Sequence, residues 1–88
     1  MADVLIYTTQ FCPFCIRAKM LLNEKKVRFQ EIKVDNNPAM RREMAEKAGQ
    51  TSVPQIWING VHVGGCDQLY LLEKKGELDG LLGQKGEM

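Results

Sequence analysis

Two cysteines separated by two residues, Cys12 and Cys15, are the side chains in this sequence best suited to chemistry. They enclose Pro13 and Phe14 in the run Cys-Pro-Phe-Cys, which follows a short apolar segment and precedes a helical pattern. The first cysteine should therefore open a helix, and the second should lie nearly one turn further along the same face. Two thiols in that arrangement could form or release a disulfide without a large backbone movement.

The start of a helix also favours the thiolate form of a cysteine, because unpaired N–H groups and the positive end of the helix dipole face it. A free thiol with a pKa of about 8.5 is only a few per cent ionised at pH 7, whereas helix N-termini and CxxC motifs lower the pKa to roughly 3.5–7.5. We therefore expect Cys12 to be the nucleophile. Cys15 lies inside the first turn and should be the more covered, resolving thiol.

A bare CxxC motif also occurs in zinc sites. In this chain His62 and Cys66 could complete a set of three cysteines and one histidine. Against that interpretation, the sequence has a single CxxC pair, and the rest of the chain is able to build its own hydrophobic core. We therefore expect no metal.

The composition excludes several other classes of protein. Hydrophobic residues make up 44% of the 88 residues, and the net charge of +1 gives no electrostatic footprint for nucleic acid or a membrane surface. No apolar stretch approaches the roughly 20 residues that span a bilayer. Three cysteines in a chain that starts without a secretory signal pattern indicate a reducing compartment, so we expect a cytoplasmic protein.

The elements that would position the cysteines can be predicted from periodicity and turn signals. The pattern predicts a strand at 4–7, a helix from 14 with Pro13 at its first position, a strand around 29–34, a helix at about 38–48, a hairpin of 55–58 and 61–63, a helix at about 67–75 and a short helix around 78–82. Asn59-Gly60 suits a type I′ turn, because both residues tolerate a positive φ.

This order predicts an α/β fold with a four-stranded mixed sheet. The first two strands are joined through a helix and should be parallel, whereas the hairpin adds two antiparallel strands. The first strand is wholly apolar, so helices should cover both faces of the sheet. We expect one domain over residues 1–83 and a flexible tail over 84–88.

Taken together, these residues resemble a glutaredoxin of the small dithiol class. The likeness extends over nearly the whole chain and depends on four motifs, Tyr7-Thr8, Cys12-Pro13-Phe14-Cys15, Ser52-Val53-Pro54 and Gly64-Gly65-Cys66-Asp67. The resemblance implies a thioredoxin-type fold, glutathione as the electron donor and a cis peptide bond before Pro54.

The resemblance also implies a glutathione site made of Arg41, Val53, Pro54, Gly65, Cys66 and Asp67. The Val53 backbone would pair with the cysteinyl part of glutathione, and Gly65 would permit close backbone approach. Asp67 and the backbone of Cys66 would hold the γ-glutamyl end, and Arg41 would reach the glycyl carboxylate. The residues alone leave plainer interpretations open, with Asp67 as a first-turn acid and Arg41 as part of a solvated helix face.

Three positions depart from the family pattern. Phe14 stands where dithiol members usually have Tyr, so a phenol hydroxyl is missing. Thr9 stands where many members have Lys, which removes a cationic group near the motif, and Ser52 replaces the more usual Thr.

The function expected from these residues is glutathione-dependent reduction of protein disulfides and protein–glutathione mixed disulfides. The partners would be glutathione and disulfide-containing or glutathionylated proteins, and we expect a monomer. One alternative is an iron–sulfur cluster carrier, against which Pro13 argues because members with this proline usually favour redox work. A less favoured alternative is a thioredoxin that a flavoenzyme reduces.

Overall fold

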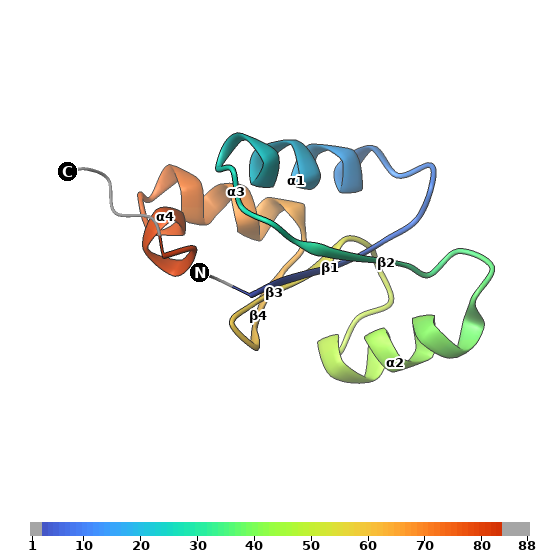
Figure 1. The fold of residues 1–88 in the computed structure, drawn as a ribbon. Helices are drawn as coiled ribbons and strands as arrows, with labels where there is room; N and C mark the ends of the chain where they lie inside the picture. The colour runs from blue at the N-terminus through green and yellow to red at the C-terminus, as the bar shows by residue number, and fades with distance from the viewer. Residues whose placement is uncertain (1–2, 84–88) are drawn as a thin grey trace.

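The computed structural model describes residues 3–83, which form a single four-stranded sheet flanked by helices (Figure 1). The elements follow one another as β1 (Val4–Thr8), α1 (Pro13–Glu24), β2 (Gln30–Lys33), α2 (Pro38–Ala48), β3 (Gln55–Ile58), β4 (Val61–Gly64), α3 (Cys66–Lys74) and α4 (Leu78–Leu81). Most of these bounds lie within one or two residues of the sequence-based predictions. The predicted tail, 84–88, lies outside the described residues.

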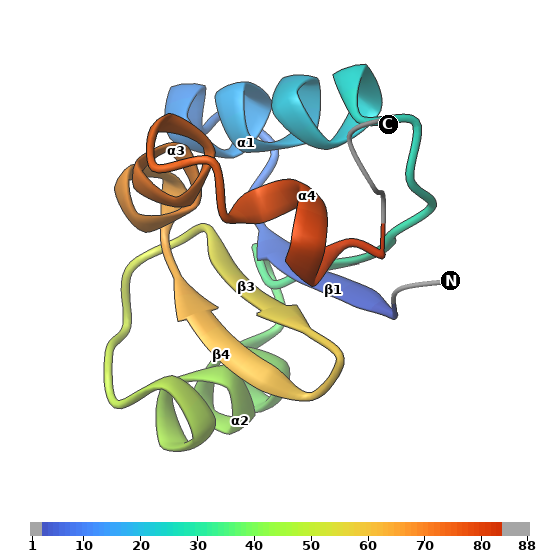
Figure 2. The same ribbon diagram turned by 90° about the vertical axis from the view of Figure 1, so that its left-hand side faces the viewer.

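The sheet has the strand order β2-β1-β3-β4. β1 is parallel to β2 and antiparallel to β3, and β3 and β4 form the predicted antiparallel hairpin. α1 and α3 lie over one face of the sheet and α2 over the other (Figures 1 and 2). This arrangement confirms the expected mixed sheet with helices on both faces. Within residues 3–83, no helix is long and apolar enough to cross a membrane.

The residues predicted to start and stop elements do so by recognisable local chemistry. Pro13 is the first residue of α1, where its missing N–H costs no hydrogen bond. The Asn37 side chain caps α2 by accepting from the backbone N–H of Met40 at 3.2 Å, and Gly49 ends that helix with a φ of 73°. Asn59 and Gly60 have φ values of 54° and 80°, as a type I′ turn requires.

Two apolar clusters hold the layers together, one on each face of the sheet. The larger cluster joins the sheet to α1, α3 and α4, and its buried members are Val4, Ile6, Ala18, Leu21, Leu22, Ile56, Ile58, Cys66, Leu69, Leu78 and Leu82. The smaller cluster consists of Tyr7, Val34 and Met44 beneath α2. α1 is therefore anchored through buried residues that belong to the same cluster as residues of β1 and β3.

The sequence pattern predicts that the first strand ends at Tyr7, but β1 extends one residue further, through Thr8. Thr8 pairs with Lys33 in the sheet and is fully buried. Its hydroxyl donates to Glu31 at 2.6 Å, and Lys19 of α1 donates to the same carboxylate oxygen at 2.9 Å. Burial acts to raise the pKa of Glu31, but these two hydrogen bonds and the charge of Lys19 outweigh it and lower the pKa below 4.5.

Candidate active site

Cys12 occupies the N-cap of α1, so its side chain meets the first unpaired amides of the helix. The backbone N–H of Cys15 donates to the Cys12 sulfur at 3.2 Å. The same thiol lies 3.8 Å from the backbone carbonyl oxygen of Val53, to which it donates. Only 8% of Cys12 is exposed, yet the residues on either side of it, Phe11 and Pro13, are exposed. The Cys12 sulfur is therefore held by backbone groups from two separate segments.

Cys15 lies one turn further along α1 and differs from Cys12 in its surroundings. It is 1% exposed, and burial and the side-chain hydrogen bond with Cys12 raise its pKa to about 12. Cys12, Cys15 and Cys66 are all free thiols in this structure. The helix thus gives its first cysteine an amide donor and keeps the second cysteine protonated.

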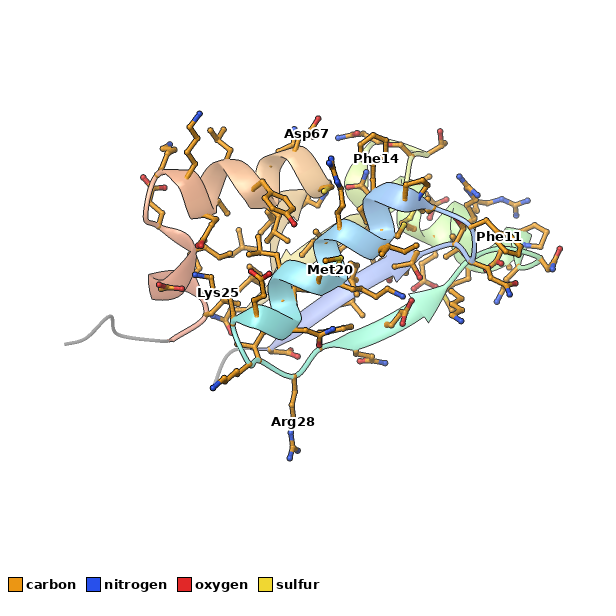
Figure 3. The ribbon with its side chains drawn as sticks, turned by 90° about the horizontal axis from the view of Figure 1, so that it is seen from above. Phe11, Phe14, Met20, Lys25, Arg28 and Asp67 are labelled. Atoms are coloured by element: carbon orange, nitrogen blue, oxygen red, sulfur yellow. The ribbon has the colours of Figure 1, made fainter. Side chains whose placement is uncertain are left out.

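A groove of about 250 Å³ adjoins the cysteine pair. It is lined by residues of α1, of the segment before β3 and of the start of α3, namely Phe14, Gln50, Ser52, Val53, Pro54, Gln55, Gly65, Cys66, Asp67 and Gln68. Figure 3 shows Phe14 and Asp67 at neighbouring ends of α1 and α3. Five of the six residues expected to hold glutathione therefore line one groove, and the Val53–Pro54 peptide bond is cis.

The start of α3 forms one wall of this groove at very close range. A Cβ atom on Gly65 would lie 3.3 Å from the carbonyl oxygen of Pro54, so the absence of a side chain allows the two segments to approach. The Gln68 side chain accepts from the Gly65 N–H at 2.9 Å. Cys66 is buried at this start, and burial raises the pKa of its thiol.

Two cationic side chains, Arg41 and Arg17, lie beside the groove and do not line it. Arg41 does not line the groove, and its guanidinium donates to the Thr51 carbonyl oxygen at 3.0 Å. Arg17, which no motif in the sequence singles out, lines an adjoining hollow with Cys66 and Asp67. Its position follows from the packing of α1 against α3, which helical periodicity alone does not reveal.

The alternative zinc set, in which His62 and Cys66 would join the two motif cysteines, does not assemble in the described part of the chain. His62 forms a hydrogen bond with Gln55 at 2.7 Å, and its ring lies against Trp57 with the centroids 4.7 Å apart and the planes tilted by 36°. Among residues 3–83, no cluster of three or more histidine, cysteine or acidic residues could hold a metal ion.

Comparisons with known proteins agree with this geometry. The glutaredoxin family model matches residues 4–63. Over 82 residues, the chain is 61% identical to a glutaredoxin of Pseudomonas aeruginosa, covering 93% of this chain and 98% of that protein. It is 55% identical to glutaredoxin 3 of Escherichia coli over 82 residues, or 93% of this chain and 99% of that protein. The crystal structure of the buckwheat glutaredoxin–glutathione complex matches 93% of this chain and 77% of its own, with a TM-score of 0.87 and 28% identity.

These likenesses confirm the family that the sequence motifs indicate, and with it the thioredoxin-like fold. The matched region includes the cysteine pair and the segment containing Val53 and Pro54. The chain belongs to the glutaredoxin family, as a thiol–disulfide oxidoreductase similar to the bacterial glutaredoxin 3 proteins.

Proposed function

We propose that this chain uses glutathione to reduce protein disulfides and protein–glutathione mixed disulfides, with Cys12 as nucleophile and Cys15 as resolving thiol. The observation that carries the proposal is the asymmetry of the pair. The Cys12 sulfur accepts a backbone N–H at 3.2 Å at the start of α1, whereas the buried Cys15 thiol has a pKa raised to about 12. An amide donor stabilises a thiolate, and the thiolate is the attacking species.

The reaction proceeds by two exchanges of sulfur partners. The Cys12 thiolate attacks one sulfur of the substrate disulfide, forms a mixed disulfide and releases the other sulfur as a thiolate. Either the Cys15 sulfur or a glutathione thiolate then attacks the mixed disulfide and releases the second substrate thiol. When Cys15 resolves it, two glutathione molecules restore the dithiol and leave as oxidised glutathione, so that two electrons pass to the substrate.

The groove beside Cys12 is suited to the glutathione part of such a substrate. Val53 offers backbone groups next to the Cys12 sulfur, and Gly65 lets the start of α3 lie close to the Pro54 carbonyl oxygen, so that both segments can contact the same ligand. Asp67, exposed in the first turn of α3, would pair with the γ-glutamyl amine, and the amides of that helix start would bind the neighbouring carboxylate. The buckwheat relative in complex with glutathione supports this assignment.

Arg41 has a supporting role in the proposed site. Its guanidinium is held on Thr51, at the entry of the segment that leads to the groove. From there it would attract the glycyl carboxylate, and we expect its loss to weaken binding modestly because an exposed charge contributes little.

A coupled turnover assay with glutathione and a small glutathione mixed disulfide tests the proposal. Cys12→Ser should abolish turnover, whereas its matched variant Cys15→Ser should retain mixed-disulfide reduction and lose reduction of an intramolecular protein disulfide. Retained activity without Cys12 would refute the assigned nucleophile. Reduction of the wild-type protein by a thioredoxin reductase but not by glutathione would refute the assigned electron donor.

A further inference from the structure

A buried glutamine connects the wall of the groove to the hairpin. Gln55, the first residue of β3, is 1% exposed. Its side-chain Nε2 donates to the Ser52 carbonyl oxygen at 3.0 Å and lies 3.4 Å from the Ser52 hydroxyl oxygen. Its Oε1 lies 2.7 Å from Nε2 of His62 on β4. Both ends of one buried amide are therefore engaged, each by a different segment of the chain.

The hydrogen-bond partners fix the direction of this connection. The Ser52 carbonyl can only accept, so the amide nitrogen of Gln55 must face it and the amide oxygen must face His62. An oxygen can only accept, so His62 must carry a hydrogen on Nε2. The neutral imidazole is thereby held in its Nε2–H tautomer, and the contact of its ring with Trp57 helps to keep that nitrogen directed at Gln55.

The far end of the connection is the segment that contacts the Cys12 sulfur. Ser52 precedes Val53, whose carbonyl oxygen lies 3.8 Å from the Cys12 sulfur, and both residues line the groove. Gln55 also lines the groove itself. Leaving one end of a buried amide without a hydrogen-bond partner costs free energy. The hydrogen-bonded series from His62 through Gln55 to Ser52 therefore has a single well-paired arrangement.

We propose that His62 is a positioning residue for the substrate groove, acting through Gln55 on the Ser52–Val53 segment. Its ring donates to Gln55, Gln55 donates to Ser52, and Val53 is thereby held in register with Cys12 and with the start of α3. His62 does not touch the reacting sulfurs. The inference rests on the proposed function, because the groove is assigned to the glutathione part of the substrate.

Steady-state kinetics of three variants test the role of the Nε2 donor. His62→Ala should raise KM for the glutathione mixed disulfide roughly 3- to 10-fold, as expected for one lost hydrogen bond, and leave kcat within about twofold. His62→Gln should restore KM, because its amide nitrogen can donate to Gln55. His62→Phe keeps an aromatic ring over Trp57 without a donor, so its KM should stay raised. An unchanged KM in His62→Ala, or rescue by phenylalanine but not by glutamine, would overturn the proposal.

Nuclear magnetic resonance of the wild-type chain and of His62→Gln provides a readout that does not depend on turnover. The nitrogen shifts of neutral His62 should identify the Nε2–H tautomer, and His62→Gln should leave the amide resonances of Ser52 and Val53 nearly unmoved. A proton found on Nδ1 alone would refute the connection. If the wild-type chain failed to turn over the mixed disulfide while the tautomer and resonances behaved as described, the proposed function would fail and the positioning of the segment would stand.

Discussion

The Cys15 thiol of the reduced, folded protein should resist alkylation far more strongly than the same thiol in the unfolded chain. Cys15 is 1% exposed, and its pKa is raised from 9.0 to about 12 by burial and by the hydrogen bond with Cys12. Only the thiolate reacts with iodoacetamide. Folding therefore removes most of the reactive form of this cysteine.

The size of the effect follows from two opposing terms. A rise in pKa of about three units lowers the thiolate fraction about a thousandfold at neutral pH. A more basic thiolate is also more nucleophilic, and with a Brønsted coefficient of about 0.4–0.5 this returns a factor of roughly 16 to 32. The net expectation is that alkylation of Cys15 is roughly 30- to 60-fold slower in the folded state, before the steric effect of burial is added.

A time course of alkylation at neutral pH, with fragment-ion mass spectrometry to separate Cys12 from Cys15, measures both rates in one experiment. The unfolded chain in guanidinium chloride provides the reference rate for each thiol. In the folded protein, Cys12 should be modified first and Cys15 should remain free. A folded-state rate for Cys15 within about fivefold of its unfolded rate would show that the raised pKa is wrong.

The Cys12→Ser variant separates the causes of this protection. It removes the charge of Cys12 and changes its hydrogen bond with Cys15, while the burial of Cys15 is kept. Cys15 should then be alkylated faster than in the wild-type chain but still more slowly than in the unfolded chain, because burial is the largest cause. Equal rates in the variant and the unfolded chain would show that burial contributes little.

Three further predictions concern the groove, the core and acid stability. Gly65→Ala adds a Cβ atom 3.3 Å from a backbone oxygen of the groove and should raise KM for the mixed disulfide about tenfold, whereas Gly80→Ala, which meets nothing within 4 Å, should not. Met44→Ala should lower the free energy of unfolding by about 2–5 kcal/mol in denaturant titrations, because Met44 is fully buried, and the exposed Met20→Ala should change it by less than about 0.5 kcal/mol. Because the folded-state pKa of Glu31 lies below its ordinary value of 4.5, its contribution to stability is present above that pH and is lost as the pH falls through the folded-state pKa. Thermal unfolding of Glu31→Gln should therefore show a smaller loss of stability on acidification than the wild-type chain.

The local parts of the fold were predictable because the residues that determine them are neighbours in sequence. Pro13 at the start of a helix, Gly49 at the end of another and Asn59-Gly60 in a tight turn each act through their own backbone preferences. The end of β1 was not predictable in this way. Thr8 is a polar residue that would be expected to end a buried strand, but its buried hydroxyl is paired with the distant Glu31.

In the candidate site, too, features that depend on sequence neighbours were predictable and features that depend on distant segments were not. The geometry of the cysteine pair follows from the first turn of one helix, so spacing alone was sufficient to predict it. The roles of Gln55 and Arg17 depend on which segments pack together in space, and an isolated polar residue in a strand or on a helix gives no such signal. Arg41 was assigned by resemblance alone, and its contact with Thr51 shows how the fold constrains the reach of its side chain.

The asymmetry of the two cysteines also bears on the order of the proposed reaction. Both the hydrogen bond and the charge of Cys12 help to keep Cys15 protonated in the resting protein. When Cys12 enters a mixed disulfide, its sulfur loses that charge and becomes a poorer acceptor for the Cys15 thiol, so two of the causes that raise the Cys15 pKa weaken and burial remains. Cys15 therefore becomes a better nucleophile only after Cys12 has reacted. Because burial still holds back its ionisation, glutathione from solvent competes with it, and mixed disulfides with glutathione should persist in Cys15→Ser only until a second glutathione arrives.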